Sequence, residues 1–583
     1  MRGRVGSIRE VRDRSPCSWC GSDGPATTLR LIDRDALMTH TNLPPSRRDF
    51  LKASALGVAG AGVGATAISS RRAAADVGAK SARQKAAHRQ RRVIYSDDGA
   101  TLLHGEPTLK SYLSRRLDHV VDTHVDTVYF NTTMWDDRYS HYPDPKVGEF
   151  VLESATPRDG EWFHFAHRYR MLAEKEGKDV LQLSLEFCKS HNLEFLWTLR
   201  MNDVHDIFEV RNRCRFKQDN PHVVLGRPGA IHYPHTDHRH YWSVLDFAQE
   251  AVRNRRLGVI KDVLAQYDVD GIDLDFMRHP LFFDSVRHGK PASDAELDIM
   301  TGLVRKVRQH VLAASDRRGR PLLLSVRTPV TVELCNHVGL DIETWLAEGL
   351  IDVLVVGCGY MPLTMPAKAL IDLSHKHNVP AYPCISHSGL KPPHAIPEAW
   401  RASASNLFAD GADGVLTFNL EYSVDRGRFT FHDVLKTIGE PPVMADLDKM
   451  YGVDWTVAGG YMHHAVPNDG TLPFTLELNK EAGLTSLPVS DDVAAAERTG
   501  KLKSIDLRVE TEGLGASDKV DLFLNGRKLQ DVQREGQLLT CNPPVATIKR
   551  GGNELGVTMT ARTDDAGSAP QLTDIQLWVR YNS

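Results

Sequence analysis

The sequence predicts a (β/α)8 barrel followed by a C-terminal antiparallel β-sandwich. Three observations support this fold class. Between residues 93 and 440, short runs rich in β-branched and aromatic residues alternate with amphipathic helical segments, as in parallel βαβ units. Eight such runs occur, which is the number that closes a barrel of this type. After residue 440 the character of the sequence changes, and from residue 471 to residue 583 apolar and polar residues alternate, which is typical of strands with one buried face.

The barrel strands are expected at 93–96, 127–131, 193–199, 271–275, 322–326, 353–356, 381–385 and 414–418. A helix between the fourth and fifth strands places Met300, Leu303, Val304 and Val307 on one face. Long connections follow strands two and three, at the end of the barrel where such enzymes keep their active sites. A doubly wound open sheet is the alternative, but no Gly-x-Gly-x-x-Gly turn follows the first strand.

The C-terminal region, residues 441–583, carries a strong hairpin signal. Asn525-Gly526 directly follows the alternating run 520–524, and this dipeptide favours a tight two-residue turn. We expect a sandwich that packs against the barrel as an accessory domain. A carbohydrate-binding module is the alternative.

Residues 1–92 differ in composition from the rest and are predicted to form a leader that is disordered or removed. Arg47-Arg48 precedes an Ala- and Gly-rich apolar run at 53–68, which resembles a twin-arginine export signal. The run is too short and too poor in large apolar residues to span a bilayer. Met38 lies at the usual distance before such a signal and is the expected start. The mature protein is therefore expected in the periplasm or outside the cell.

The composition excludes some classes of function. The formal net charge is -4 and no long basic run follows the leader, so nucleic acid is a poor candidate partner. Outside the leader, six cysteines are widely scattered, and we expect mostly free, buried thiols: Cys188, Cys214, Cys335, Cys358, Cys384 and Cys541.

The most informative stretch is the fourth strand, 271–275. Its period of two directs Asp273 and Asp275 to the same side, which we take to be the barrel interior. Charged side chains are rarely buried there without a task or a partner. Two neighbouring carboxyl groups also drive their pKa values apart, so that one stays protonated while the other ionises. The alternative is a structural pair satisfied by arginines or backbone amides.

This stretch resembles known glycoside hydrolase motifs. Residues 270–275 are similar to the fourth-strand motif of chitinases, but Met277 stands where those enzymes have a catalytic Glu. The match is better to a bacterial glycosyl-hydrolase-like barrel family of unknown function, in Tyr267, residues 268–272, Asp275 and Pro280.

Phe276 and Arg278 depart from the pattern of that family. Residues 251–253 and 339–345 look like those of its secreted planctomycete-type relatives. The resemblance covers about residues 93–425 and implies a barrel that acts on carbohydrate, with Asp275 as the central carboxylate.

Other strand ends supply candidate partners. Glu333 follows the fifth strand and Glu421 the eighth, and either is a candidate for the second catalytic carboxylate. Their separation from Asp275 would be about 5–5.5 Å in a retaining enzyme and about 6.5–9.5 Å in an inverting one. Strand three ends in a polar cluster of candidate substrate-binding residues, Arg200, Asn202, Asp203 and His205.

Three arginines, Arg200, Arg278 and Arg327, are candidates for substrate binding at the same rim. Their guanidinium forks would suit an anionic polysaccharide. Alternatively they neutralise Asp203, Asp273 and Asp275. Three aromatic residues could offer flat faces to sugar rings or belong to the core: Tyr95, Trp135 and Trp242.

The loop 232–240 holds four histidines and Asp237, which could bind a transition metal, although a solvated loop is the preferred interpretation. We therefore expect a glycoside hydrolase with paired carboxylates and no cofactor or metal. A non-catalytic carbohydrate-binding barrel is the first alternative. A metal-dependent hydrolase that uses this loop with Asp203 and His205 is the second.

Overall fold

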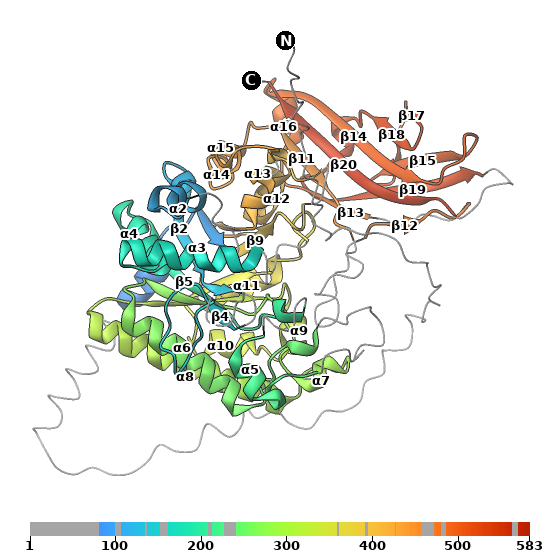
Figure 1. Ribbon diagram of the computed structural model, residues 1–583. Coiled ribbons are helices and arrows are strands. Elements are labelled where there is room, and N and C mark those ends of the chain that lie inside the picture. The colour runs from blue at the N-terminus through green and yellow to red at the C-terminus, as the bar shows by residue number, and fades with distance from the viewer. Residues whose placement is uncertain are drawn as a thin grey trace, which may run out of the picture. The chain divides into compact units, whose positions relative to one another are not determined.

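In the computed structural model, eight parallel strands form a closed barrel in the order β1-β10-β9-β8-β7-β6-β5-β2 (Figure 1). The structure describes residues 81–99, 106–134, 137–151, 161–207, 213–226, 241–357, 361–390, 394–425, 427–455, 471–479, 485–562 and 569–582. The closed parallel sheet confirms the predicted fold class and excludes the open-sheet alternative.

All eight predicted strands occur close to their predicted positions. They are β1 (Val93–Asp97), β2 (Val125–Asn131), β5 (Glu194–Arg200), β6 (Gly271–Asp275), β7 (Leu323–Thr328), β8 (Val353–Val356), β9 (Ala381–Ser386) and β10 (Val415–Phe418). The short pair β3 (Thr133–Met134) and β4 (Arg138–Tyr139) follows β2. Each of the eight barrel strands is almost entirely buried because helices cover the outside and side chains fill the inside.

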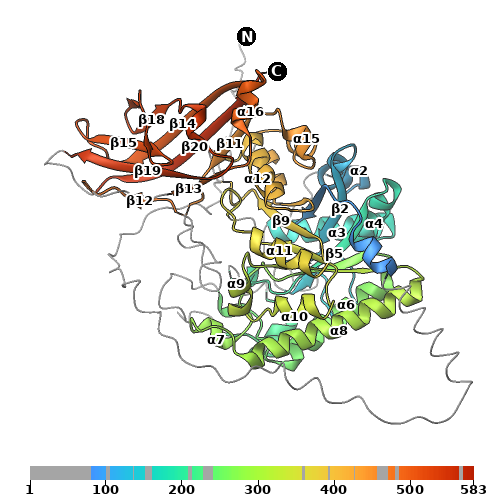
Figure 2. The same ribbon diagram turned by 180° about the vertical axis from the view of Figure 1, so that it is seen from behind.

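Helices connect the strands and surround the barrel (Figures 1 and 2). The longer ones are α2 (Leu109–Arg116), α3 (Glu161–Glu176), α4 (Val180–Ser190), α6 (Glu250–Gln266), α8 (Asp294–Arg318), α11 (Lys368–Lys376) and α12 (Pro397–Ala409). The shorter ones are α5 (Arg215–Asp219), α7 (Asp284–Arg287), α9 (Val332–His337), α10 (Ile342–Ala347), α13 (Leu420–Asp425), α14 (Phe431–Leu435), α15 (Pro441–Met444) and α16 (Val493–Arg498).

Helix α8 shows how local sequence defines an element. Ser293 and Glu296 form a capping box at its start, and Gly319 ends it in the left-handed conformation. The apolar face predicted for this helix is buried, including Met300 and Val307. Helices α6 and α8 pack against one another on the outside of the barrel (Figure 2).

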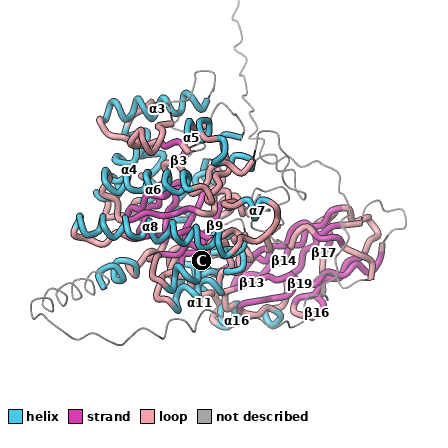
Figure 3. Tube along the Cα trace, turned by 90° about the horizontal axis from the view of Figure 1, so that it is seen from below, coloured by secondary structure: helices cyan, strands magenta, loops and turns pink. Residues whose placement is uncertain are grey.

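The C-terminal region forms two antiparallel sheets that share one hydrophobic core (Figure 3). The first contains β11 (Lys449–Gly452), β12 (Phe474–Thr475), β14 (Leu502–Glu512), β17 (Gln533–Glu535), β18 (Leu538–Cys541) and β20 (Gln571–Tyr581). The second contains β13 (Thr485–Val489), β15 (Lys519–Leu524), β16 (Arg527–Lys528) and β19 (Gly551–Ala561). The predicted hairpin joins β15 to β16, with Asn525 and Gly526 both at positive φ, as a tight turn of this kind requires.

Hydrogen bonds join the barrel helix α12 to the sandwich directly. The Asn406 side chain donates to the carbonyl of Pro488 at 3.1 Å and accepts from the backbone N–H of Ser490 at 3.0 Å. Arg401 donates to the carbonyl of Asp448 at 2.8 Å. The sandwich therefore packs on the barrel through specific polar contacts.

The folded region begins before residue 93, where the sequence analysis placed the end of the leader. Residues 81–87 are helical, and the buried Arg91 donates to Glu194 on β5 at 2.6 and 2.8 Å and to the carbonyl of Ala87 at 2.6 Å. The leader must therefore end before residue 81, because residues 81–91 are folded and contact the start of the barrel strands. The proposed signal residues and Met38 lie outside the described residues.

Three further predictions concern the described residues. Five cysteines are buried thiols that form no disulfide: Cys188, Cys214, Cys335, Cys384 and Cys541. Cys358 lies outside the described ranges. Within those ranges, no helix combines the length and the apolar character needed to cross a membrane, and no group of three or more His, Cys, Asp or Glu side chains could hold a metal ion.

Candidate active site

The carboxyl end of β6 holds a fully engaged carboxylate. Asp275 accepts two parallel hydrogen bonds from Arg327 on the neighbouring strand β7, both at 2.9 Å. It also accepts from the backbone N–H groups of Met277 at 2.9 Å and Arg278 at 3.3 Å. Both Asp275 and Arg327 are buried. This two-point pairing stabilises the ionised form of the carboxyl group.

Asp273 lies two residues before Asp275 on β6 and has a different environment. It is buried and accepts a hydrogen bond from the hydroxyl of Ser325 at 2.8 Å. Burial, together with the nearby charge of Asp275, raises the pKa of Asp273 to about 7. The two carboxyl groups of this strand therefore have different partners: Arg327 for Asp275 and Ser325 for Asp273.

The end of β1 supplies two carboxylates that the sequence analysis missed, Asp97 and Asp98. Arg116 of α2 pairs with Asp97, at 2.7 Å from its Nε. The chain can turn directly after them because the next residue is Gly99, whose φ is +72° and where a Cβ would lie 2.4 Å from the carbonyl oxygen of Asn131. The same rule that selected the other strand ends would have found this Asp-Asp pair.

Arg200, at the end of β5, bridges two of these strand ends. Its guanidinium pairs with the carboxylate of Asp98, donates to the Asp98 carbonyl at 2.9 Å, and donates to Asp203 at 2.7 Å. Burial alone would raise the pKa of Asp98, but Arg200 and Arg278 outweigh it and hold that pKa below its ordinary value. Asp98 is therefore ionised.

Asp203 and His205 form a dyad beside this bridge. Asp203 Oδ1 lies 2.7 Å from His205 Nδ1, and His205 Nε2 lies 3.4 Å from a guanidinium nitrogen of Arg278. Burial opposes ionisation of Asp203, but His205 and Arg200 hold its pKa well below the ordinary value. The side chain of His205 is 24% exposed, whereas that of Asp203 is buried. Asp203 therefore belongs to the buried cluster, and His205 lies at its solvent-exposed side.

Phe418, the last residue of β10, has two arginines close to its ring. The guanidinium carbon of Arg327 is 4.5 Å from the ring centroid, and that of Arg278 is 5.7 Å away. The arginines predicted at the rim do converge there. Arg200 pairs with Asp98 and Asp203, and Arg327 pairs with Asp275, whereas Asp273 accepts from Ser325. The ion pairs of the alternative interpretation thus occur for Asp203 and Asp275.

Glu421, in the first turn of α13 after β10, is a buried acid with few donors. Among the described residues, no hydrogen bond from another residue reaches either of its carboxyl oxygens. Burial, then the neighbouring charges of Asp97 and Asp98, raise the pKa of Glu421 to about 8. Asn419, two residues earlier, is buried at φ +58°, and its Oδ1 likewise has no donor among the described residues.

Other predicted site residues lie apart from this cluster or are used in packing. Glu333 is exposed in the first turn of α9, unlike the buried Glu421. The amide of Asn202 donates to the carbonyl of Leu281 at 2.7 Å and accepts from the backbone N–H of Leu245 at 2.9 Å, so it ties two loops together.

The predicted aromatic platforms belong to packed regions. Tyr95 is buried with its ring edge-on to His119 at 5.1 Å, and Trp242 is buried with the guanidinium of Arg213 5.1 Å from its ring centroid. Neither therefore presents an open face to a sugar ring. Trp135 and the loop 232–240 lie outside the described residues.

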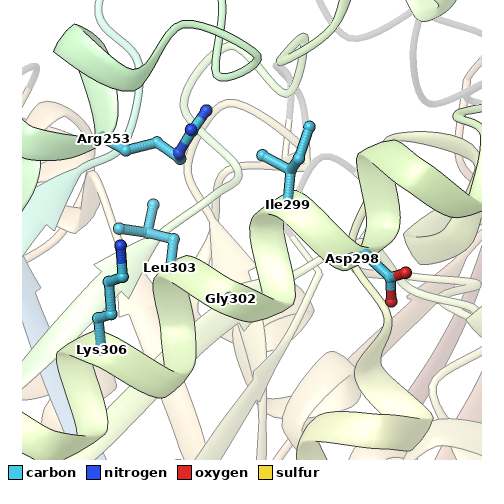
Figure 4. A pocket seen from close by; sticks show the side chains of 6 residues that line it. All are labelled: Arg253, Asp298, Ile299, Gly302, Leu303 and Lys306. Atoms are coloured by element: carbon cyan, nitrogen blue, oxygen red, sulfur yellow. The ribbon is translucent and has the colours of Figure 1, made fainter.

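A hollow on the outside of the barrel lies away from these residues (Figure 4). Arg253 of α6 and Leu303 and Lys306 of α8 line it, and none of its lining residues belongs to a strand end. Its side chains come from helix surfaces, so the strand-end cluster remains the candidate site.

The residues that carry the family resemblance divide between the two ends of β6. Tyr267 donates to Asp179 of α4, and Arg320 donates to Asp268 at 2.7 Å and Asp270 at 2.8 Å. These contacts hold the start of the strand. Only Asp275 lies in the strand-end cluster.

Comparison with known proteins gives one family match, to a signal sequence, and several distant structural similarities. Residues 44–64 match the twin-arginine translocation pathway signal sequence. No curated protein matches this sequence. Among solved structures, the chain is similar to alpha-L-fucosidase isoenzyme 2 from Paenibacillus thiaminolyticus, at 12% identity and a TM-score of 0.38, over 61% of this chain and 50% of that chain. The chain thus spans half the length of that fucosidase.

Two further structures are similar to this chain. The PgaB (BpsB) glycoside hydrolase domain from Bordetella bronchiseptica matches at 10% identity and a TM-score of 0.35, over 58% of this chain and 95% of that one. A glycoside hydrolase family 18 N-acetylglucosaminidase from Paenibacillus barengoltzii matches at 12% identity and a TM-score of 0.30, over 58% of this chain and all (100%) of that one. The matched signal confirms the predicted twin-arginine motif at Arg47-Arg48 and supports export by that pathway.

Proposed function

We propose that the protein is a glycoside hydrolase in which Glu421 is the general acid and Asp275 the ionised carboxylate. The observation that carries this proposal is the contrast between the two carboxyl groups. Asp275 accepts two charged hydrogen bonds from Arg327, whereas burial raises the pKa of Glu421 to about 8. Glycoside hydrolysis needs one protonated and one ionised carboxyl group at the same pH.

The chemistry assigns a task to each group. Glu421 would donate its proton to the glycosidic oxygen as the bond to the anomeric carbon breaks. Asp275 would face the positive charge that develops on the sugar ring, either attacking the anomeric carbon or directing a water molecule to it. Neither step requires a cofactor. Metal analysis of the purified protein tests the metal-dependent alternative.

Substitution of Glu421 tests this assignment. A glutamine at 421 retains the shape and neutrality of the protonated acid but cannot donate a proton to the leaving group. Glu421→Gln should therefore lower kcat on a cleavable glycan by about 10²–10⁴-fold, with little change in melting temperature.

Glu333→Gln is the matched control because Glu333 is the other glutamate suggested by the sequence and is exposed. Activity should survive this change. Loss of activity in Glu333→Gln together with retention in Glu421→Gln would transfer the acid role to Glu333.

A non-catalytic carbohydrate-binding barrel is the second candidate. The observation that favours it is the complete engagement of Asp275 by Arg327 and two backbone N–H groups, as expected of a structural ion pair. Such a protein would bind glycans and hydrolyse none of them. Screening the purified protein for both binding and release of reducing sugar separates the two candidates.

We also propose that the mature protein works in the periplasm or outside the cell, as the signal at residues 44–64 suggests. Replacing both Arg47 and Arg48 by lysine should leave the precursor in the cytoplasm, because the pathway reads the arginine pair. Fractionation and immunoblotting measure this. Normal export of the variant would contradict the assignment.

A further inference from the structure

We propose that the strand-end site takes an uncharged sugar, recognised through its hydroxyl groups, rather than a sugar that carries carboxylate or sulfate. This inference rests on the proposed function and names its substrate class. It also decides against the anionic polysaccharide that the three rim arginines suggested from the sequence.

The first argument is that the buried arginines already have anionic partners. Arg327 makes a two-point pair with Asp275, and Arg200 pairs with both Asp98 and Asp203. A substrate carboxylate or sulfate would have to displace a protein carboxylate from one of these pairs. The displaced group would then be left buried and charged without a partner, which is strongly unfavourable.

The second argument is the charge balance of the cluster. Four guanidinium groups, of Arg116, Arg200, Arg278 and Arg327, face four aspartates, Asp97, Asp98, Asp203 and Asp275. Glu421 adds no charge at neutral pH because its pKa is raised to about 8. Burial raises the pKa of Asp97, while the charge of its partner Arg116 opposes this rise. The neighbouring aspartates thus offset most of the arginine charge, and little positive charge is left to attract an anion.

The third argument is that the site contains buried oxygen atoms to which no described residue donates a hydrogen bond. Asn419 Oδ1 and the carboxyl oxygens of Glu421 are buried, and no other described residue donates to them. Buried acceptors are normally satisfied by a donor. Sugar hydroxyl groups supply such donors, whereas a carboxylate or sulfate supplies none. It would meet Asn419 Oδ1 and the carbonyl oxygen of the protonated Glu421 repulsively, and only the O–H of Glu421 could donate to it.

His205 connects this cluster to solvent. Its Nδ1 lies 2.7 Å from Asp203 Oδ1, and its Nε2 lies 3.4 Å from a guanidinium nitrogen of Arg278. With a side chain that is 24% exposed, His205 marks the side of the cluster that faces solvent.

Binding to a glycan microarray that carries both neutral and anionic glycans tests the substrate class, followed by calorimetry with oligosaccharide probes. The neutral probes are maltoheptaose, cellohexaose and N-acetylchitohexaose, and the anionic probes are oligogalacturonate and a heparin hexasaccharide. We expect the bound glycans to be neutral and their affinity to change less than twofold between about 50 and 500 mM salt. Preferential binding of anionic glycans, or binding of none, would overturn the inference.

Two variants sharpen the test. Asn419→Ala should weaken binding of the neutral probe about tenfold, because it removes an acceptor. Lys306→Ala, in the outer hollow of Figure 4, is the matched control and should bind as the wild type does. Equal affinity of Asn419→Ala and the wild type would contradict the recognition by acceptors.

Because binding is measured without turnover, the inference and the proposed function can fail separately. Binding of neutral glycans without hydrolysis would refute the enzyme and keep the substrate class. Hydrolysis of an anionic glycan would keep the enzyme and refute the substrate class.

Discussion

Both ends of the barrel contain buried ion pairs, but they differ in the buried oxygen atoms to which no described residue donates a hydrogen bond. At the start of the strands, Glu194 accepts two hydrogen bonds from Arg91 and one from the hydroxyl of Thr127 at 2.8 Å. At the carboxyl ends, Asp275 is held by Arg327 with the same two-point geometry. The second end also has buried acceptor oxygens, on Asn419 and Glu421, to which no other described residue donates.

This difference distinguishes features that stabilise the fold from features that bind a ligand. A buried ion pair with satisfied partners is compatible with either end of a barrel, so pairing alone does not mark an active site. Acceptors that lack donors lower stability unless a ligand supplies the hydrogen bonds. Their occurrence at the carboxyl ends agrees with the place where barrels of this type bind substrates.

The largest expected effect is on the matched carboxylates Asp275 and Glu194. Each substitution, Asp275→Asn and Glu194→Gln, leaves a buried arginine with a weakened partner and should lower the free energy of unfolding by about 3 kcal/mol. Urea denaturation measures this. Only Asp275→Asn should also abolish the activity of the folded fraction.

Asp275→Asn is therefore expected to lower both stability and activity. If both variants lose activity only in proportion to the fraction unfolded, Asp275 is a structural partner like Glu194. The comparison between the two ends would then not separate catalysis from stability.

The next effect is a pH dependence of stability that arises from Glu421. Because its pKa is raised from 4.5 to about 8 in the folded protein, the folded state binds more protons than the unfolded state between these pH values. Stability therefore falls as pH rises from about 4.5 to 8, by at most about 1.4 kcal/mol per pH unit for this one group. Activity should fall above pH 8, when the acid ionises.

Glu421→Gln should flatten this slope, since glutamine does not titrate. Asp273, with its pKa raised to about 7, will leave a residual slope of the same sign in the variant. Unfolding measured in urea at pH 5 and pH 8 gives the difference. An unchanged slope would mean that Glu421 is ionised in the folded protein.

The smallest effect on the free energy of unfolding is expected for an exposed ion pair near the start of the barrel strands. Lys189 pairs with Asp268, and both side chains are more than a third exposed. Lys189→Ala should change the free energy of unfolding by no more than about 0.5 kcal/mol, because solvent screens such pairs. Thermal denaturation measures this, and a loss above about 1 kcal/mol would show that the edge contributes more than its exposure suggests.

Much of the fold was predictable because it depends on local pattern. Strand 271–275, the capped helix after it and the Asn525-Gly526 hairpin each follow from residues close together in the chain. The candidate site was predicted less well. Asp275 and Glu421 do lie at strand ends in buried surroundings, but Glu333 is exposed and Asp98 was missed.

Sequence pattern alone settled the eight-stranded barrel, the change to alternating strands after residue 441 and the twin-arginine signal, because periodicity and short motifs act over a few residues. The pairing of charges is decided by how the strands pack in the sheet. Arg200 reaches the carbonyl and carboxylate of Asp98, 102 residues away in the chain, because β5 and β1 both pair with β2 and lie on either side of it. Which carboxyl group ionises depends on such long-range neighbours and on burial, and neither is encoded in local spacing.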